Sequence, residues 1–392
     1  RNPDLKRLQD EGYDVEIRAG YLIVHAIPYV NSRGEVLLGK MVSVLELAAD
    51  LTQKPSDHIM YFAGEHPCDD RSNELNKIKH QSVVREIDRE LSTQHSFSSK
   101  PEGGYSDYYQ KVVTYARILS NYAKELQPDS TPTPFNPIVA EAPDCVFNYI
   151  DTASSRAQIS GINQKLEKIR RLGIVGLGGT GAYLLDLVAK TQVGEIHLFD
   201  GDVLRQHNAF RGPGAVSIAD LQRAPKKVDY YRGQYLPLRS SIVAHHCFIE
   251  ESNVELLKDM DFVFICVDSG SAKKLIFRKL QGFGVPFIDV GMGLELHQET
   301  SSLTGLVRVT TSTPESQNHL WDKQLVSFAD DHDGIYSRNI QAADLNCLNA
   351  TLAVAKLKRI YGVYLDLEHE HHSVYALDGN LLFNSEHSED AS

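Results

Sequence analysis

The sequence predicts an α/β protein with a mainly parallel sheet in its C-terminal part, preceded by a smaller α+β domain. Three observations support this fold class. Short β-branched apolar runs end at glycine or aspartate, helix-like segments separate these runs, and one run is followed by a glycine-rich turn. A chain of 392 residues has room for two domains of ordinary size.

The stretch from Arg171 to Arg211 is the most informative part of the chain. The run Leu172–Val175 is typical of a buried strand, Ala182–Val193 of a helix, and Glu195–Phe199 of a second strand that ends at Asp200. Between the first strand and the helix stand four glycines, whose backbone N–H groups can approach an anionic ligand closely. These glycines are Gly176, Gly178, Gly179 and Gly181. The pattern predicts a nucleotide-binding half-unit.

Gly176, Gly178 and Gly181 also fit the ordinary dinucleotide fingerprint, which leaves an NAD-dependent oxidoreductase as an alternative. In that alternative Asp200 holds ribose hydroxyls. The polar residues that follow favour another chemistry, because cations and a metal-binding carboxylate suit a nucleotide triphosphate better than hydride transfer. They are Asn208, Arg211, Lys227 and Asp268.

Residues from about 156 to 384 resemble the ThiF/MoeB-like adenylyltransferases of the ubiquitin-activating enzyme superfamily. The matching pieces are GLGGTG, the D-x-D of FDGDV, N-x-x-R, the P-x-K-V of PKKV and the aspartate of CVDSG. Each piece is modest by itself, but their order and spacing fit together. The resemblance implies a Rossmann-like adenylation domain that uses ATP and Mg²⁺.

The resemblance also implies roles for these residues. The glycine turn holds phosphates, Asp200 takes the ribose hydroxyls, and Asp268 ligates Mg²⁺. Three residues sit on the triphosphate and are expected to act in catalysis together with Asp268: Asn208, Arg211 and Lys227. Three alternatives stay open: Lys226 replaces Lys227, Asp202 shapes the turn rather than binding nucleotide, or Asp268 only caps the helix that begins near Ser271.

The expected substrate is the C-terminal carboxylate of a ubiquitin-like or sulfur-carrier protein, which attacks the α-phosphate and expels pyrophosphate. Family members place an arginine ahead of the domain that reaches the partner subunit's ATP. Arg156 is the best match, so we expect a homodimer; a surface arginine is the alternative. The resemblance leaves open whether a conjugating enzyme receives the acyl group. It also suggests a bacterial origin.

A covalent intermediate has few candidates. Cys266 is expected inside an apolar strand and Cys347 inside a helix over Ile340–Tyr361, so Cys347 and Cys68 are weak nucleophile candidates. The hydroxyl-rich stretches 300–302 and 310–316 stand where a crossover loop would pass. An oxyester through Ser301 or Ser302 is therefore the alternative to a thioester.

Composition excludes several classes of function. The net charge of −12 argues against nonspecific nucleic-acid binding, and no stretch approaches the length of apolar chain that spans a membrane. The five cysteines form no C-x-x-C pair, which predicts a reducing cytoplasm and no structural zinc site.

The N-terminal domain is expected over residues 1–140 and is assigned to partner or substrate recognition. We predict strands over Tyr21–Val30, Glu35–Val42 and His58–Phe62, and helices over Val83–Leu91 and Tyr108–Ala123. The sequence His66-Pro67-Cys68 only echoes the His-Pro-Asn signature of the ubiquitin-conjugating fold, so that fold is not claimed. A linker is expected over 141–155, the adenylation domain over 156–384, and a disordered tail over 385–392.

Two clusters of polar residues contain side chains of the kinds that bind metal ions. The first contains His25, His58, Glu65, His66 and Cys68, and the second is the run Glu368–His372. Neither has a trusted ligand spacing, so we interpret both as ordinary polar residues. Three hypotheses remain for the whole chain: an ATP-dependent activator, a nicotinamide-dependent oxidoreductase, and a catalytically inactive scaffold on the same fold.

Overall fold

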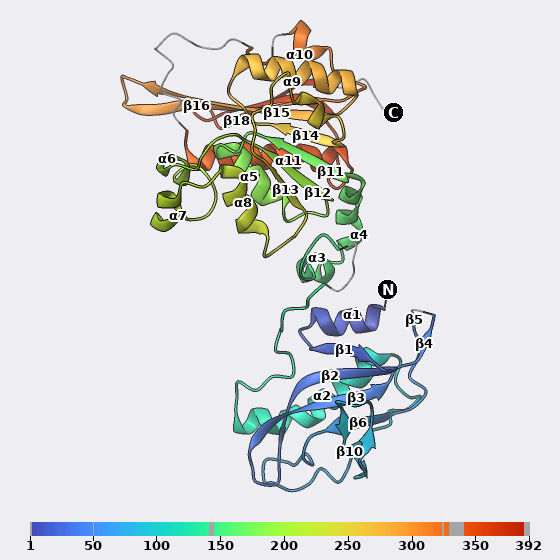
Figure 1. The fold of residues 1–392 in the computed structure, drawn as a ribbon. Helices are drawn as coiled ribbons and strands as arrows, with labels where there is room; N and C mark the ends of the chain where they lie inside the picture. Colours follow the sequence, from blue (N-terminus) through green and yellow to red (C-terminus); the bar gives the residue numbers. More distant parts are fainter. Residues whose placement is uncertain (1, 50, 141–144, 324, 329–340, 388–392) are drawn as a thin grey trace. The chain divides into compact units, whose positions relative to one another are not determined.

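The structure is a computed structural model that describes the chain except residues 1, 50, 141–144, 324, 329–340 and 388–392 (Figure 1). The chain divides into two compact units. Unit 1 comprises Arg1–Ile138 and Ser155–Ala157, and unit 2 comprises Val139–Ser154 and Gln158–Ser392. Residues 141–144 of the expected linker lie outside the described residues. Each unit has its own hydrophobic core.

Unit 1 is an antiparallel sheet packed against one long helix, α2 (Tyr108–Leu126). The strand order is β1-β2-β3-β6-β10-β7, and neighbouring strands pair antiparallel. The remaining elements are α1 (Pro3–Asp10), β1 (Val15–Arg18), β2 (Tyr21–Val30), β3 (Val36–Val44), β4 (Leu47–Ala48), β5 (Leu51–Thr52), β6 (Ile59–Ala63), β7 (Lys79–Gln81), β8 (Arg85–Glu86), β9 (Ser92–Thr93) and β10 (His95–Ser98). Helix α2 buries Tyr108, Val112 and Tyr115, whose spacing places them on one face.

The three strands and the long helix predicted for this part are confirmed within a few residues. The helix predicted over Val83–Leu91 is wrong, because that segment contains β8 and a turn leading to β9. The Asp88 side chain explains the difference. Its Oδ1 accepts the N–H groups of Glu90 (2.8 Å) and Leu91 (2.9 Å), and this local turn competes with helical hydrogen bonds.

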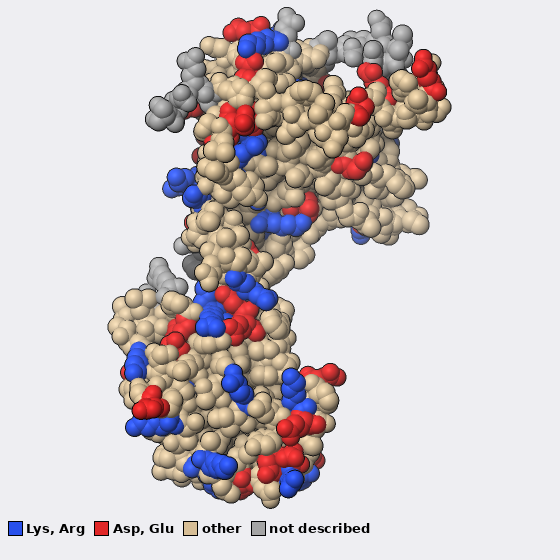
Figure 2. Space-filling model, turned by 180° about the vertical axis from the view of Figure 1, so that it is seen from behind, with Lys and Arg blue, Asp and Glu red and all other residues tan. Residues whose placement is uncertain are grey.

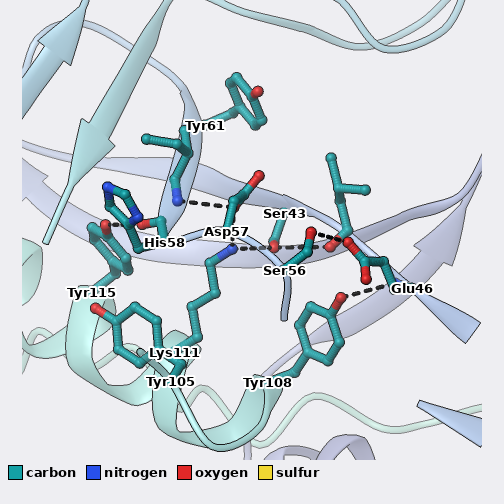
Figure 3. Close-up of polar contacts among 12 residues, drawn as sticks. Ser43, Glu46, Ser56, Asp57, His58, Tyr61, Tyr105, Tyr108, Lys111 and Tyr115 are labelled. Atoms are coloured by element: carbon teal, nitrogen blue, oxygen red, sulfur yellow. Dashed lines mark hydrogen bonds and ion pairs between the residues drawn. The ribbon is translucent and has the colours of Figure 1, made fainter. Parts of the chain in front are cut away.

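A buried lysine fastens α2 to the sheet (Figure 3). The Lys111 side chain is 1% exposed, and its Nζ donates to Asp57 Oδ1 (2.9 Å) and Ser43 Oγ (3.0 Å). Burial lowers the pKa of Lys111, while the hydrogen bond and the charge of Asp57 raise it. One turn further along α2, the Tyr115 hydroxyl bonds the carbonyl of His58 (2.5 Å). The segment before β6 is thus held by the helix that covers it.

We predict that Asp57→Ala destabilises unit 1 more than Lys111→Met does. The first change leaves a buried ammonium unpaired, at a cost of about 3 kcal/mol, whereas the second leaves a carboxylate that is 39% exposed and stays solvated, at about 1 kcal/mol. Hydrogen–deuterium exchange of the α2 amides measures the local opening free energy. Equal loss of protection in the two variants would contradict this asymmetry.

Unit 2 is built on an eight-stranded sheet with the order β13-β12-β11-β14-β15-β16-β17-β18. The five strands from β13 to β15 run parallel, and β16, β17 and β18 continue the sheet antiparallel. The strands are β11 (Arg171–Val175), β12 (Glu195–Phe199), β13 (Ile242–His245), β14 (Phe262–Ile265), β15 (Phe287–His297), β16 (Ser302–Ser312), β17 (Glu370–Ala376) and β18 (Leu381–His387). The predicted fold class, a Rossmann-like α/β unit beside a smaller α+β unit, is confirmed.

Helices cover both faces of this sheet (Figure 1). Helices α5 (Gly179–Val188), α8 (Lys227–Tyr235) and α11 (Ala343–Ile360) pack on one face, and α9 (Gly270–Phe283) and α10 (His319–Asp322) pack on the other. The shorter helices of this part of the chain are α3 (Thr152–Arg156), α4 (Ser160–Asn163), α6 (Gln206–Ala209) and α7 (Ile218–Arg223). Strand β14 in the middle of the sheet is apolar and buried throughout, as expected for a parallel strand covered on both faces.

Arg239 is buried completely without a carboxylate partner among the described residues. Its Nη1 and Nη2 groups donate to the carbonyls of Ala189, Thr191, Val193 and Gly194, which follow α5. Burial lowers the pKa of Arg239 to about 10. The guanidinium therefore satisfies carbonyls of the segment between α5 and β12, and so fixes that connection.

Two expectations about the end of the chain need correction. Residues 300–302 and 310–316 were expected in a crossover loop, but β15 and β16 form one long hairpin that includes residues 302–312. Strand β18 also runs to His387, three residues into the expected disordered tail; residues 388–392 lie outside the described part. Both strands extend further than expected because polar residues occupy the exposed face of an antiparallel sheet.

Acidic and basic side chains are interspersed on the face that Figure 2 shows, rather than gathered into a basic surface. This distribution gives no support to nucleic-acid binding on that face. In the described part of the chain, every helix is too short or too polar to cross a bilayer.

Candidate active site

A cavity of about 1460 Å³ lies in unit 2, where its lining includes the residues that follow β11, β12 and β14. The carboxyl ends of parallel strands are the usual place for ligands in such sheets. Nine of the predicted site residues line it together: Gly176, Gly178, Gly179, Asp200, Asp202, Asn208, Arg211, Lys227 and Asp268. Gly181 and Arg156 do not belong to the lining.

The glycines of the turn differ in what requires them. Gly176 has φ +92°, and a Cβ on Gly181 would lie 1.9 Å from the carbonyl oxygen of Gly176. A Cβ on Gly179 would lie 1.9 Å from Nδ2 of Asn346. These three positions are therefore restricted by the protein itself. Gly178 is different, because no described atom lies within 4 Å of a Cβ built on it, and it lines the cavity. The open space over Gly178 fits a ligand that approaches the backbone.

Asp200 holds the turn in place. Its Oδ2 accepts the N–H of Leu177 (2.7 Å), its Oδ1 accepts the N–H of Asp202 (2.8 Å), and Lys227 Nζ lies 3.5 Å from Oδ2. Lys227 itself pairs with Asp202 at 2.7 Å. The neighbouring Lys226 donates to the carbonyl of Gly201 (2.8 Å). Asp200 and Asp202 thus take part in shaping the turn, and Lys227 shares its charge with both.

Asn208 and Arg211 stand on the next segment, around α6. Asn208 is buried, and its Oδ1 accepts the N–H of Arg205 (2.8 Å). The Arg211 Nε is buried and has no hydrogen-bond partner among the described residues. An unpaired buried donor costs roughly 1–3 kcal/mol, so this atom favours an anionic ligand in the cavity. Desolvation and the charges of Arg211 and Lys227 lower the pKa of His207, which indicates a positive potential here.

Asp268 follows β14 and is exposed to the cavity. The alternative that it caps α9 is wrong, because α9 begins at Gly270 and its N-cap is Ser269, which accepts the N–H of Ala272. A carboxylate that lines the same cavity as the glycine turn suits Mg²⁺, which usually takes one or two carboxylates together with substrate phosphates. The residues present therefore fit a Mg²⁺–triphosphate ligand.

A buried ionic cluster that the sequence did not reveal lies in the same cavity wall. Asp289 is fully buried, with Lys273 Nζ 3.0 Å from its Oδ1 and Arg308 Nη2 2.6 Å from its Oδ2. Two cations face one carboxylate, so the cluster keeps a net positive charge. A Cβ on Gly291 would lie 2.6 Å from Arg308 Nη2, which explains the glycine at that position.

Comparison with known protein families gives a match for each of two parts of the chain. Residues 153–297 match the ThiF family, and residues 3–152 match a domain of unknown function, DUF6791. Residues 153–297 form a ThiF-family domain. No curated protein shows significant sequence similarity to the chain.

Several solved structures resemble part of the chain at low sequence identity. A crystal structure of PaaA has 18% identity and a TM-score of 0.44, covering 60% of this chain and 69% of that chain. A structure of E. coli MccB with AMPCPP and MccA has 17% identity and a TM-score of 0.46, covering 61% of this chain and 72% of that chain. MccB with ATP has 17% identity and a TM-score of 0.44, covering 59% and 67%.

Helix α11, beyond the matched ThiF residues, completes the cavity. Asn346 is buried, its Nδ2 donates to the Arg211 carbonyl (3.2 Å), and its Oδ1 accepts from the Thr180 hydroxyl (2.9 Å). One turn later Asn349 donates to the Gly291 carbonyl (2.9 Å). These two asparagines were missed because nothing in their local sequence distinguishes them. Their spacing of three on one helix face was the available signal.

The remaining sequence candidates lie elsewhere. The Arg156 Cζ is 5.9 Å from the ring centroid of Phe135, within unit 1. Its expected role concerns a second subunit and stays a prediction. Ser301 and Ser302 stand at the β15–β16 turn.

The surroundings of Cys266 and Cys68 do not activate their thiols. Cys266 lies just past β14 and lines the cavity, so the expectation of a cysteine inside the strand is wrong. Burial and the nearby Asp289 raise the pKa of its thiol, and burial raises the pKa of Cys68. Cys347 is half-buried on α11. A thiol with a raised pKa is a poor nucleophile, so neither Cys266 nor Cys68 is favoured.

The two polar clusters do not assemble metal sites in the described chain, where no group of three or more His, Cys, Asp or Glu residues can hold a metal ion. In the first cluster His25 pairs with Glu16 (2.8 Å) and Glu65 with Arg33 (3.0 Å). The second cluster forms the start of β17. There Glu370 pairs with Arg359 (2.6 Å), and His372 Nδ1 bonds the Thr310 hydroxyl (3.0 Å).

We predict that two alanine substitutions in the glycine turn differ in their effect on stability. Gly181→Ala forces a Cβ against the Gly176 carbonyl and lowers stability by about 3 kcal/mol, because backbone cannot move aside easily. Gly178→Ala meets open space and leaves the thermal unfolding midpoint unchanged. Differential scanning calorimetry checks both. A strongly destabilised Gly178→Ala variant would show that this glycine is needed by the protein alone.

A second prediction concerns acid pH. Burial, followed by the charge of Arg308, lowers the pKa of His372 to about 4, so the unfolded chain binds more protons than the folded chain between about pH 6.5 and 4. Stability is therefore lost as the pH falls through this window, by about 1.4 kcal/mol per pH unit from this residue. Fluorescence of Trp321, the single tryptophan, follows unit 2 in denaturant. His372→Asn is expected to flatten the slope; an unchanged slope would refute the assignment.

Proposed function

We propose that the chain is an ATP-dependent adenylyltransferase that activates the C-terminal carboxylate of a ubiquitin-like or sulfur-carrier protein. One observation carries the proposal: Asn208, Arg211, Lys227 and Asp268 come together with the glycine turn in a single cavity. They come from segments up to sixty residues apart, and a triphosphate is the ligand that needs all of them. The ThiF family of residues 153–297 supports the same reaction class.

In the proposed reaction an oxygen of the substrate carboxylate attacks the α-phosphorus. The bond from that phosphorus to the bridging oxygen breaks, and pyrophosphate leaves with the electron pair, so that an acyl adenylate remains. Arg211 and Lys227 offset the charge that develops on the phosphates, and Asn208 helps to orient them. Asp268 would hold Mg²⁺, which supplies further charge neutralisation when bound.

Asp200 and Arg156 complete the proposed set. A carboxylate can accept about four hydrogen bonds, so Asp200 retains capacity for the ribose hydroxyls beside the two N–H groups it already accepts. Arg156 belongs to the proposal of a homodimer in which each subunit reaches the other's phosphates. Recognition of the carrier or of a conjugating enzyme is assigned to unit 1.

The oxidoreductase alternative rests on the glycine turn and Asp200. It leaves Arg211, Lys227 and Asp268 without a role at the phosphate end. The inactive-scaffold alternative is disfavoured by the retention of the same three residues. ATP–pyrophosphate exchange with candidate carrier proteins, run beside a test of NADH turnover, separates the three hypotheses.

We predict that Arg211→Ala and Asp268→Ala abolish exchange while both variants stay folded. Loss of the Arg211 guanidinium is expected to weaken ATP binding by about 10- to 100-fold, the usual worth of a charge-assisted hydrogen bond. Asp259→Ala, an exposed aspartate that does not line the cavity, serves as the control and keeps full exchange. Full exchange in the Arg211 and Asp268 variants would refute the site.

A further inference from the structure

Two chemically different kinds of residue line the cavity. The glycine turn and the polar residues Asn208, Arg211 and Lys227 suit phosphates. The apolar residues of the lining include Val175, Phe199, Phe248, Ile249, Val267 and Ile276. A nucleotide also has two kinds of group, a flat apolar base joined through ribose to anionic phosphates. No sequence motif pointed to the apolar residues.

Phe248 stands out in this lining because its side chain is exposed. Its neighbour Ile249 is 5% exposed and belongs to the core, whereas Phe248 is 55% exposed although it lines the cavity. By contrast, Val175, Phe199 and Ile276 of the same lining are at most 2% exposed. An aromatic ring left open towards a cavity is available to a ligand.

One side of the ring rests on the backbone of the Asp200-Gly201-Asp202 turn. A Cβ on Gly201 would lie 2.6 Å from Cε2 and 2.7 Å from Cδ2 of Phe248, so only glycine leaves room for the ring there. The turn is itself fixed, since Asp200 accepts the N–H of Asp202 and Lys226 donates to the Gly201 carbonyl. The ring is therefore supported from below by a rigid backbone.

The segment that carries Phe248 is also fixed. It follows β13, and Asn253 bridges it by donating Nδ2 to the Phe248 carbonyl (2.8 Å) while its Oδ1 accepts the N–H of Glu250 (2.8 Å). With Ile249 anchored in the core, the position of Phe248 is preset rather than formed on binding. Such preorganisation is what a stacking platform requires.

We infer that the exposed face of Phe248 stacks on the nucleobase of the bound nucleotide. The inference rests on the proposed function, because it takes the triphosphate at the glycine turn as the point from which the base is placed. The support by Gly201, next to Asp200, puts the ring beside the residue proposed for the ribose. Stacking on an aromatic ring contributes to binding whatever the base, so Phe248 acts on affinity rather than on the choice of base.

Isothermal titration of the full chain with ATP and with inorganic tripolyphosphate tests the inference. Tripolyphosphate has the phosphates without a base. Phe248→Ala is expected to raise the Kd for ATP by between about fivefold and about a hundredfold, and to leave the Kd for tripolyphosphate within about twofold. Phe248→Trp keeps an aromatic face and should retain ATP affinity. Arg211→Ala should weaken both ligands.

Phe383→Ala is the matched control, since Phe383 is 56% exposed on β18 and does not line the cavity. It should change neither Kd. An unchanged Kd for ATP in Phe248→Ala would overturn the inference while leaving the proposed function standing. An equal loss of both ligands would also overturn it, because the ring would then support the whole cavity. A wild-type chain that binds neither ligand would overturn the proposed function as well.

Discussion

The candidate site depends on one buried carboxylate. The glycine turn after β11 has almost no side chains of its own to hold it, so its position must be set from outside. Asp200 does this by accepting the N–H of Leu177 in the turn and the N–H of Asp202 beyond β12. Lys227, at the start of α8, lies close enough to balance the charge. A single side chain thus joins the glycine turn, the turn that contacts Phe248 and the helix that begins at Lys227.

A site residue could be predicted from the sequence where the residues next to it in the chain show its position in the fold. The glycines, Asp200 and Asp268 follow strands, and the carboxyl ends of parallel strands meet at one edge. Lys227 begins α8, whereas Asn208 and Arg211 lie in and just after α6. Their presence in one cavity could therefore be expected from order alone. Asn346 and the cluster of Lys273, Asp289 and Arg308 could not, because their partners are distant in sequence and neither set has a motif. From the sequence, Phe248 was interpreted as part of an apolar strand, because its contact with Gly201 is visible only in the structure.

The secondary structure could also be predicted only where the signal is local and periodic. Long periodic elements such as α2 and β2 were found from their pattern, and β11 and β14 from their short apolar runs. Val83–Leu91 failed as a helix because one side chain, that of Asp88, competes for the backbone N–H groups. The β15–β16 hairpin was missed because its hydroxyl-rich strand resembles a loop in composition. Both errors arise where side chains, rather than apolar periodicity, decide the backbone path.

The pocket depends on Asn346, a residue that is synthesised long after the glycine turn that it supports. The residue lies more than 160 positions after the glycine turn, yet it occupies the space beside Gly179, bonds Thr180 and holds the Arg211 carbonyl. A nascent chain that has made only the first strands and α5 still lacks this support. The nucleotide pocket therefore cannot reach its final shape until the ribosome has released α11, and a product truncated before that helix would carry every motif without a finished pocket.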